Sequence, residues 1–293
     1  MRSPELSLIH NGALQALARP VQVIAVTGGK GGVGKTSVSV NLACALAAAQ
    51  RRVVLLDGDL GLANADVFLG LSPRHTLAHV LAGERTLDEV LLEAPQGFHV
   101  VPAASGAADL AAMGAAEHLG LVRAFSSLAA RLDVLIVDTA AGISPGVLQF
   151  SQACQHVLVV ICDEPASLTD AYALVKVLSR NHDVGRFRVL ANRIRSPGTG
   201  LELFQRFQRV TSRFLDVTLE YAGEIPECEH LRRSVREQRP VFDGYPGSAS
   251  ARAFKKLGGA ADKWPVPPGP RGNIEFFVER LVRRNAARLE LVP

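Results

Sequence analysis

Short runs of apolar residues alternate with longer stretches of helical spacing along most of the chain. The apolar runs are bounded by glycine, proline or acidic residues, which is typical of buried strands. They include Val21 to Val26, Arg52 to Leu56, Val134 to Val137 and Val157 to Cys162. Because strands and helices alternate, the pattern predicts an α/β fold with a doubly wound, mainly parallel sheet flanked by helices.

The pattern changes at both ends of the chain. Residues 1–20 form a leader that Pro20 separates from the first predicted strand. Residues 264–272 are rich in proline, which predicts an extended and stiff linker. Residues 273–293 place apolar side chains on one helical face and arginines on the others. We therefore expect a flexible leader, an α/β domain over 21–263, a linker and an amphipathic C-terminal helix.

The amphipathic segment has two interpretations that the sequence leaves open. From His230 to the end, 13 Lys and Arg stand against 6 Asp and Glu, whereas the whole chain carries only +4. A basic amphipathic helix behind a linker can bind anionic lipid reversibly, and two helices in a dimer bind more strongly than one. Alternatively, the apolar face of this helix packs against its own domain.

Length and composition narrow the possible classes of protein. With 293 residues and 48% hydrophobic content, the chain can bury a full core in one large domain. Its four cysteines form no C-x-x-C pair, which argues against structural zinc and against an iron–sulfur carrier. Apolar runs such as Val157 to Cys162 are far too short to cross a bilayer, and no secretory signal is visible.

The glycine-rich stretch after the first predicted strand carries the most specific chemistry. It has the pattern Gly-x4-Gly-Lys-Thr between a strand and a helix, so its backbone N–H groups can surround a polyphosphate at a helix N-terminus. Lys35 would reach the β/γ-phosphates, and the Thr36 hydroxyl would bind Mg²⁺. The predicted nucleotide contacts of this loop are Gly29, Lys30, Gly31, Gly32, Val33, Gly34, Lys35, Thr36 and Ser37.

Three aspartates follow predicted strands, at the edge where parallel sheets bind ligands. Asp138 would bind Mg²⁺ through water, and Asp57 would hold a Mg²⁺-bound water or the loop itself. We expect Asp59 to orient the water that attacks the phosphate. Helix capping could explain either Asp57 or Asp59 singly. The turn from Thr139 to Gly142 could contact the γ-phosphate and act as a switch.

Another pair of acidic residues, Asp163 and Glu164, follows the strand that ends at Cys162. Acidic residues at this place most often cap the next helix, which we expect over Leu168 to Ser179. The other interpretation is that Glu164 contacts the opposite protomer of a dimer or its nucleotide.

Taken in order, the motifs KGGVGKT, DGDLGLAN, DTAAG and the pair ANR and GEIPE resemble those of the MinD/ParA family of dimerising ATPases. The resemblance implies ATP and Mg²⁺ as cofactors and a homodimer in the ATP-bound state. It implies that Lys30 acts across the dimer on the partner's nucleotide, as an arginine finger does, and that Lys30, Lys35 and Asp59 carry slow ATP hydrolysis. It also implies base contacts from Asn192, Arg193 and an Ile225-Pro226 turn. The family usually has proline where this chain has Ala140.

The base is expected to be adenine rather than guanine. A GTPase would need an N/T-K-x-D run where this chain reads Asn-Arg-Ile-Arg from Asn192, without an aspartate. An amide such as that of Asn192 can both donate and accept, which suits the paired groups on the adenine edge.

Within the family, the segments DLGLANADVFLGL and EFFVERLV are similar to those of the FleN/FlhG group, which regulates the number of polar flagella. That similarity implies an anti-activator of a FleQ-type transcription regulator, a partnership with a FlhF-type GTPase, and a cytoplasmic protein associated with the inner face of the cytoplasmic membrane, with the pole as a candidate site. The alternative is a ParA-type chromosome partition ATPase. ParA proteins usually have Asp-Pro-Gln after the second aspartate, so this chain resembles the MinD side of the family. We do not expect direct DNA binding.

Overall fold

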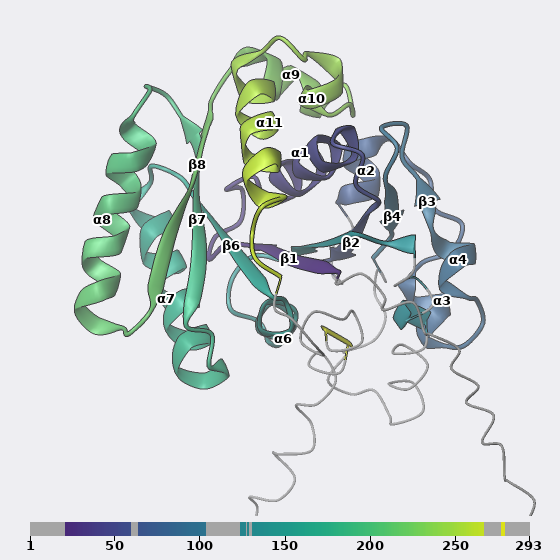
Figure 1. Ribbon diagram of the computed structural model, residues 1–293, viewed down its shortest axis with the longest axis horizontal. Coiled ribbons are helices and arrows are strands. Elements are labelled where there is room, and N and C mark those ends of the chain that lie inside the picture. Colours follow the sequence, from purple (N-terminus) through teal and green to yellow (C-terminus); the bar gives the residue numbers. More distant parts are fainter. Residues whose placement is uncertain are drawn as a thin grey trace, which may run out of the picture.

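The computed structural model describes residues 21–59, 64–103, 124–126, 128, 131–266 and 277–278 of the chain. Eight strands form a single sheet with the order β3-β4-β2-β5-β1-β6-β7-β8 (Figure 1). Neighbouring strands pair in parallel, except that β3 is antiparallel to β4. The predicted doubly wound α/β fold is therefore confirmed.

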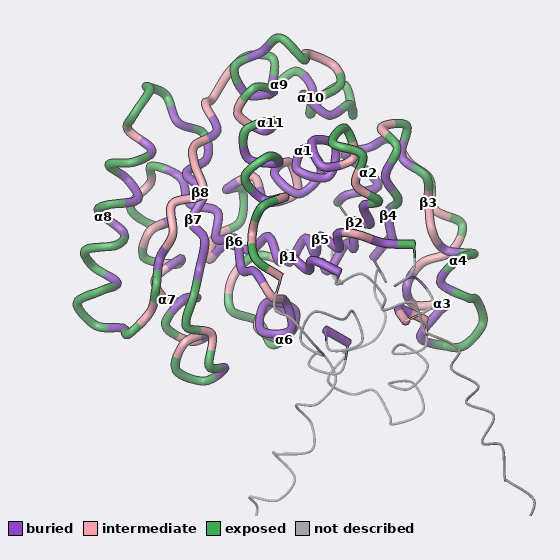
Figure 2. Tube along the Cα trace, in the orientation of Figure 1, coloured by how far each residue is buried: buried purple, intermediate pink, exposed green. Residues whose placement is uncertain are grey.

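The strands at the centre of the sheet coincide with the continuous aliphatic runs. Residues of β1, β2, β5 and β6 are buried throughout, because helices cover both faces of a parallel sheet (Figure 2). The strands are β1 (Gln22–Thr27), β2 (Val53–Gly58), β3 (Leu92–Glu93), β4 (His99–Val101), β5 (Val134–Thr139), β6 (His156–Ile161), β7 (Arg186–Ile194) and β8 (Thr218–Pro226).

The helices lie on the two faces of the sheet. Apolar side chains of α1, α2, α10 and α11 pack on one face, and those of α3, α4, α6, α7 and α8 pack on the other. The helices are α1 (Lys35–Ala48), α2 (Ala65–Leu69), α3 (Leu77–Leu81), α4 (Leu87–Val90), α6 (Pro145–Ala153), α7 (Pro165–His182), α8 (Thr199–Phe214), α9 (Glu229–Arg236), α10 (Val241–Gly244) and α11 (Ala249–Ala261). None of the helices in the described ranges is long and apolar enough to cross a bilayer.

Several elements differ from the sequence-based expectation. We did not predict α6 or α8, and α7 begins at Pro165 rather than at Leu168, because proline is well suited to the first turn of a helix. Strand β8 continues to Pro226. The expected Ile225-Pro226 turn is therefore wrong: both residues belong to the end of a strand, which is held by pairing with β7.

The chain stays packed against the domain as far as Trp264. The Gln22 side-chain amide donates to the Ala261 carbonyl at 2.8 Å, and the Trp264 ring lies 4.4 Å from the Arg188 guanidinium. Phe277, a residue of the predicted amphipathic helix, is buried with its ring 6.2 Å from that of Phe125. The leader 1–20, positions 267–276 and positions 279–293 lie outside the described residues, so the predicted division of the chain stays a prediction.

Candidate functional site

The glycine-rich loop joins β1 to α1 and has the backbone conformation that only glycine adopts without strain. Gly34 has φ 91°, and a Cβ atom there would lie 2.5 Å from the Asn192 side-chain amide. A Cβ at Gly29 would overlap the backbone of Asp170 in α7. At Gly31 and Gly32 a Cβ would meet nothing within 4 Å, so the loop is open on that side. The loop is thus packed tightly against the domain at Gly29 and Gly34, and it leaves open space at Gly31 and Gly32.

Lys35 follows the loop as the first residue of α1, and its side chain is only 8% exposed. Burial lowers the pKa of Lys35, and the negative charges of Asp138 and Asp59 act in the opposite direction. An ammonium group in this position is available to a phosphate rather than to bulk water.

Asp57 and Asp138 lie side by side, because they are register partners on the parallel strands β2 and β5. Asp138 is 2% exposed and accepts a hydrogen bond from the Ser39 hydroxyl at 2.9 Å. Burial, followed by the nearby Asp57 charge, raises the pKa of Asp138 to about 7, although hydrogen bonds from Thr36 and Ser39 oppose the shift. Burying two carboxylates side by side costs free energy. A bound divalent cation would offset that cost.

The Asp57 carboxylate organises the loop that follows β2. It accepts hydrogen bonds from the backbone N–H groups of Asp59 at 3.0 Å, Asn64 at 2.9 Å and Ala65 at 3.0 Å. Burial raises the pKa of Asp57 to about 6. These hydrogen bonds favour the interpretation in which Asp57 holds the loop rather than a Mg²⁺-bound water. Asp59 lies beside it and receives a hydrogen bond from the Asn64 amide at 3.5 Å, while residues 60–63 of the motif lie outside the described residues.

The predicted switch turn contacts the phosphate loop directly. The Gly142 N–H donates to the Gly28 carbonyl at 3.1 Å, and the Thr139 hydroxyl donates to the Val26 carbonyl at 3.3 Å. The structure therefore brings together the turn after β5 and the loop after β1, as expected from their places on adjacent strands.

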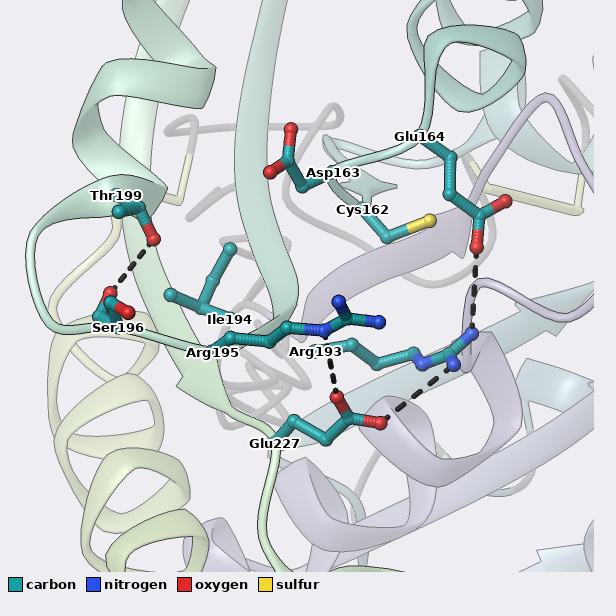
Figure 3. Close-up of a pocket in the computed structure, with 9 residues that line it drawn as sticks. All are labelled: Cys162, Asp163, Glu164, Arg193, Ile194, Arg195, Ser196, Thr199 and Glu227. Atoms are coloured by element: carbon teal, nitrogen blue, oxygen red, sulfur yellow. Dashed lines mark hydrogen bonds and ion pairs between the residues drawn. The ribbon is translucent and has the colours of Figure 1, made fainter.

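Lys30 is held by an acidic residue of the same chain. Its ammonium lies 2.6 Å from the Glu164 carboxylate, and this ion pair raises the pKa of Lys30 and lowers that of Glu164. Glu164 also lies 3.8 Å from Arg193, which in turn lies 3.8 Å from Glu227. Figure 3 shows Glu164, Arg193 and Glu227 lining one pocket together with Arg195. The Arg195 guanidinium lies 3.5 Å from the Glu227 carboxylate.

Of the residues expected at the base, Asn192 is fixed most closely to the loop. Its side-chain N–H donates to the Val33 carbonyl at 2.8 Å, and its buried oxygen has no hydrogen-bond partner among the residues that the structure describes. The Ile225 side chain is fully buried in the core, and the Pro226 carbonyl accepts a hydrogen bond from the Ser250 hydroxyl at 2.8 Å. The structure thus keeps Asn192 at the phosphate loop and places Ile225 among core residues.

The residues present fit a bound magnesium nucleotide. Besides the Asn192 oxygen, the Thr27 and Ser37 hydroxyls are buried near the loop without a partner in the described part of the chain, although buried polar atoms normally have one. Mg²⁺ is usually held by one or two carboxylates together with hydroxyl, phosphate and water oxygens. Across the described ranges no cluster of three or more His, Cys, Asp or Glu side chains forms a complete metal site by itself.

Ser39 and Glu227 contact site residues, and neither contact was predicted from the sequence. Ser39 lies one helical turn after Lys35, so its spacing in α1 could have indicated a contact with the same carboxylate. Glu227 follows β8 and pairs with two arginines that follow β7. No local signal marks that pairing, because it depends on the two strands being neighbours.

Comparison with known proteins agrees with this geometry. Residues 24–241 match the family described as the CobQ/CobB/MinD/ParA nucleotide binding domain. The antiactivator FleN of Pseudomonas aeruginosa is 57% identical over 267 residues, which cover 91% of this chain and 95% of FleN. The flagellum site-determining protein YlxH of Helicobacter pylori is 33% identical over 265 residues, covering 89% of each chain.

A solved structure has the same fold and a ligand of the expected kind. The septum site-determining protein MinD from Pyrococcus horikoshii, complexed with Mg-ADP, superimposes with a TM-score of 0.65 at 28% identity, covering 83% of this chain and 96% of that chain. With the matched nucleotide-binding domain, the full-length relatives and this fold, the chain belongs to the MinD/ParA family of P-loop ATPases.

Proposed function

We propose that this chain is an ATP-switched homodimer that limits the number of polar flagella by acting as an antiactivator of a transcription regulator. The 57% identity to the antiactivator FleN along nearly the whole of both chains is the observation that carries this proposal. The similarity to YlxH, which is named as a flagellum site-determining protein, supports the flagellar role. The chain binds ATP with Mg²⁺ and hydrolyses ATP, in keeping with its family.

Most of the predicted site residues have a role in this proposal. The loop N–H groups and Lys35 bind the phosphates, and Asn192 and Arg193 lie near the base. Thr36 and Asp138 hold Mg²⁺, with Asp57 supporting the loop beside them. The bound ion supplies positive charge that offsets the charge developing on the transferred phosphoryl group. Asp59 orients the attacking water.

Lys30 acts on the nucleotide of the second subunit. In the single chain its ammonium is bound to Glu164, so it must leave this partner before it can contact a phosphate across a dimer. The monomer then lacks the cation that Lys30 of a second subunit would add to Lys35 and Mg²⁺ at the transferred phosphoryl group, and hydrolysis therefore depends on dimerisation.

The closed dimer is the form that partners bind in this proposal. We expect a FleQ-type transcription regulator, a FlhF-type GTPase and the anionic membrane surface, which contacts residues 273–293. Phe277 and Val278 of that segment are buried against the domain, so binding to lipid requires that they leave it. We keep 1–20 as leader, 21–263 as ATPase domain, 264–272 as linker and 273–293 as the membrane-binding segment.

Sedimentation of the purified chain tests the switch. We expect a monomer with ADP and a dimer with a non-hydrolysable ATP analogue and Mg²⁺. Lys35→Gln should stay monomeric with the analogue because it loses a phosphate contact, and Asp59→Ala should accumulate as a dimer with ATP itself because hydrolysis stops. An Asp59→Ala protein that remains monomeric at saturating ATP would show that the switch assignment is wrong.

Vesicle flotation tests the membrane partner separately. The full chain with the ATP analogue should float with vesicles that contain phosphatidylglycerol, and a chain truncated after Gly272 should not. Retention on nonspecific DNA that persists after the truncation would instead support the chromosome partition function.

A further inference from the structure

The outer face of α7 and α8 carries a groove that the nucleotide site does not use. Its volume is about 700 Å³, and its lining includes Leu168 and Tyr172 from α7 and Val210 and Phe214 from α8. Figure 1 shows both helices beside β7 and β8, near one edge of the sheet. The groove therefore lies on a surface formed by two neighbouring helices.

The apolar side chains of this groove are unusually exposed for a domain with a full core. Val210 is 52% exposed and Phe214 is 57% exposed, and their spacing of four residues places them on the same face of α8. Leu203 and Phe207 belong to the same apolar stripe of α8 and are buried in the core in the preceding turns, so α8 is already anchored without Val210 and Phe214. Grouped exposed apolar side chains mark an interaction site more often than isolated ones do.

Arginines of the same helix border the apolar side chains. Arg206 pairs with Asp163, whereas no acidic side chain in the described part of the chain lies within ion-pair distance of Arg209 or Arg213. The Arg213 guanidinium lies 5.4 Å from the centre of the Phe214 ring. Arginine together with tyrosine and phenylalanine is the composition enriched in protein–protein interfaces. The complementary surface is apolar and carries acidic groups at its edge.

We propose that this groove binds an acidic amphipathic helix of a partner protein. A groove between two helices suits a third helix that inserts side chains at positions i, i+3, i+4 and i+7. The ends of the chain itself do not have the required charge: residues 273–293 contain four Arg and three Glu, and residues 1–20 contain two Arg and one Glu. A bilayer is also a poorer occupant, because helices that bind membranes bury a protruding apolar face rather than a concave one.

The groove borders the turn that holds Lys30. Arg206, which lies beside the groove, pairs with Asp163, and the next residue along the chain, Glu164, binds Lys30. A partner that draws Arg206 away from Asp163 would therefore act on the turn next to the nucleotide site. The proposal itself goes beyond the ATP-driven dimer and does not require it.

Fluorescence anisotropy with two synthetic helical peptides tests the groove on the full chain without nucleotide. Both peptides carry leucine at i, i+3, i+4 and i+7, and one is flanked by glutamate and the other by lysine. The glutamate peptide should bind at least about tenfold more tightly than the lysine peptide. The double variant Arg209→Glu with Arg213→Glu should reverse this preference, and Phe214→Ala should weaken binding about tenfold.

Matched controls separate the groove from general charge effects. Arg232→Glu with Arg236→Glu places the same charge change on exposed arginines of α9 and should leave peptide binding unchanged. Circular dichroism and ATP hydrolysis should be normal for all of these variants. Equal binding of the two peptides, or equal loss in the α9 control, would overturn the proposal.

Two further outcomes would assign the groove to another occupant. Flotation with phosphatidylglycerol vesicles that Phe214→Ala abolishes would identify a membrane surface. Self-association of the wild-type chain without nucleotide that Phe214→Ala prevents would identify a second copy of the chain. Either result would contradict the proposed partner helix, whereas a dimer that forms only with ATP and is unaffected by Phe214→Ala is compatible with it.

Discussion

At the scale of single residues, Lys30 has a partner within its own chain before any dimer forms. The Lys30 and Glu164 side chains are 37% and 43% exposed, so solvent screens the pair and exchange to another partner costs little. In the isolated chain, Glu164 therefore holds Lys30 in place. The pair is weak enough for Lys30 to exchange to the nucleotide of a second subunit, as its proposed role requires.

Replacing Glu164 should therefore favour the dimer. We expect Glu164→Gln to dimerise at roughly two- to fivefold lower protein concentration with an ATP analogue, because Lys30 no longer has to leave an ion pair. Sedimentation equilibrium measures the change. Asp88→Asn removes an exposed, ion-paired carboxylate away from the nucleotide site and should have no such effect. A weaker dimer in Glu164→Gln would mean that Glu164 contributes to the interface instead.

His156 gives the chain a distinct dependence of stability on pH. Burial, together with the positive charges of Arg188 and Arg186, lowers the pKa of His156 to about 3, so the folded chain keeps the ring neutral at pH values where the unfolded chain binds a proton. The free energy of unfolding should fall as the pH decreases below 6.5, by up to about 1.4 kcal/mol per pH unit from this group.

Urea denaturation at several pH values checks this contribution. His156→Gln should show a flatter decrease of the unfolding free energy between pH 6.5 and pH 4 than the wild-type chain. His99→Gln, which changes an exposed histidine of β4, should follow the wild-type slope. The same slope in both variants would show that His156 does not cause the loss of stability.

Site residues that belong to one local motif could be predicted from the sequence. Contacts between residues that are distant in the sequence could not. Lys35, Thr36 and Asp138 lie near one another as expected, because the loop and the strand ends fix them. The pair of Lys30 and Glu164 joins residues 134 positions apart, and only the pairing of β1 with β6 brings them together. The sequence gives no direct signal for such a contact.

At the scale of elements, the packing of α11 on α1 depends on one glycine. A Cβ atom at Gly258 would lie 2.7 Å from the Cβ of Ala45, whereas at Gly259 it would meet nothing within 4 Å. Both glycines lie in the same helix, so the difference between them is steric and does not come from helix propensity.

Alanine substitution should thus have opposite effects at the two positions. Gly258→Ala should lower the free energy of unfolding by about 1–2 kcal/mol, because the two helices must separate slightly. Gly259→Ala should raise it by about 0.5–1 kcal/mol through better helix propensity. Thermal or urea unfolding measures both changes, and an equal gain in the two variants would show that the α1–α11 contact is not close.

The elements differ in how far their sequence predicts them. The central strands are continuous aliphatic runs and were predicted to within one or two residues. Helix α8 is polar at most positions and has no continuous apolar run, although Leu203, Phe207 and Thr211 recur every four residues and are buried. The exact ends of β7 and β8 depend on their mutual pairing, which local patterns do not encode.

At the scale of the whole molecule, nucleotide binding should be visible as stability. Mg-ATP at about 100 times its dissociation constant should add about 2.7 kcal/mol to the free energy of unfolding, because the unfolded chain has no phosphate loop. For a chain of this length that corresponds to a rise in Tm of about 5 °C. Differential scanning fluorimetry measures the shift.

The effect of single lysines distinguishes binding at the loop from general charge effects. Lys35→Gln should lose most of the rise in Tm, since it removes a buried contact to the phosphates. Lys176→Gln, an exposed position of α7, should keep the full shift. An unchanged shift in Lys35→Gln would show that ATP binds elsewhere.

The junction at Trp264 also provides an optical reporter. It is the only tryptophan of the chain, and its ring stacks on the Arg188 guanidinium at the start of the predicted proline-rich linker. Its intrinsic fluorescence therefore comes from a single known environment. A change in emission wavelength on adding nucleotide or vesicles would signal that the junction detaches, without any attached dye.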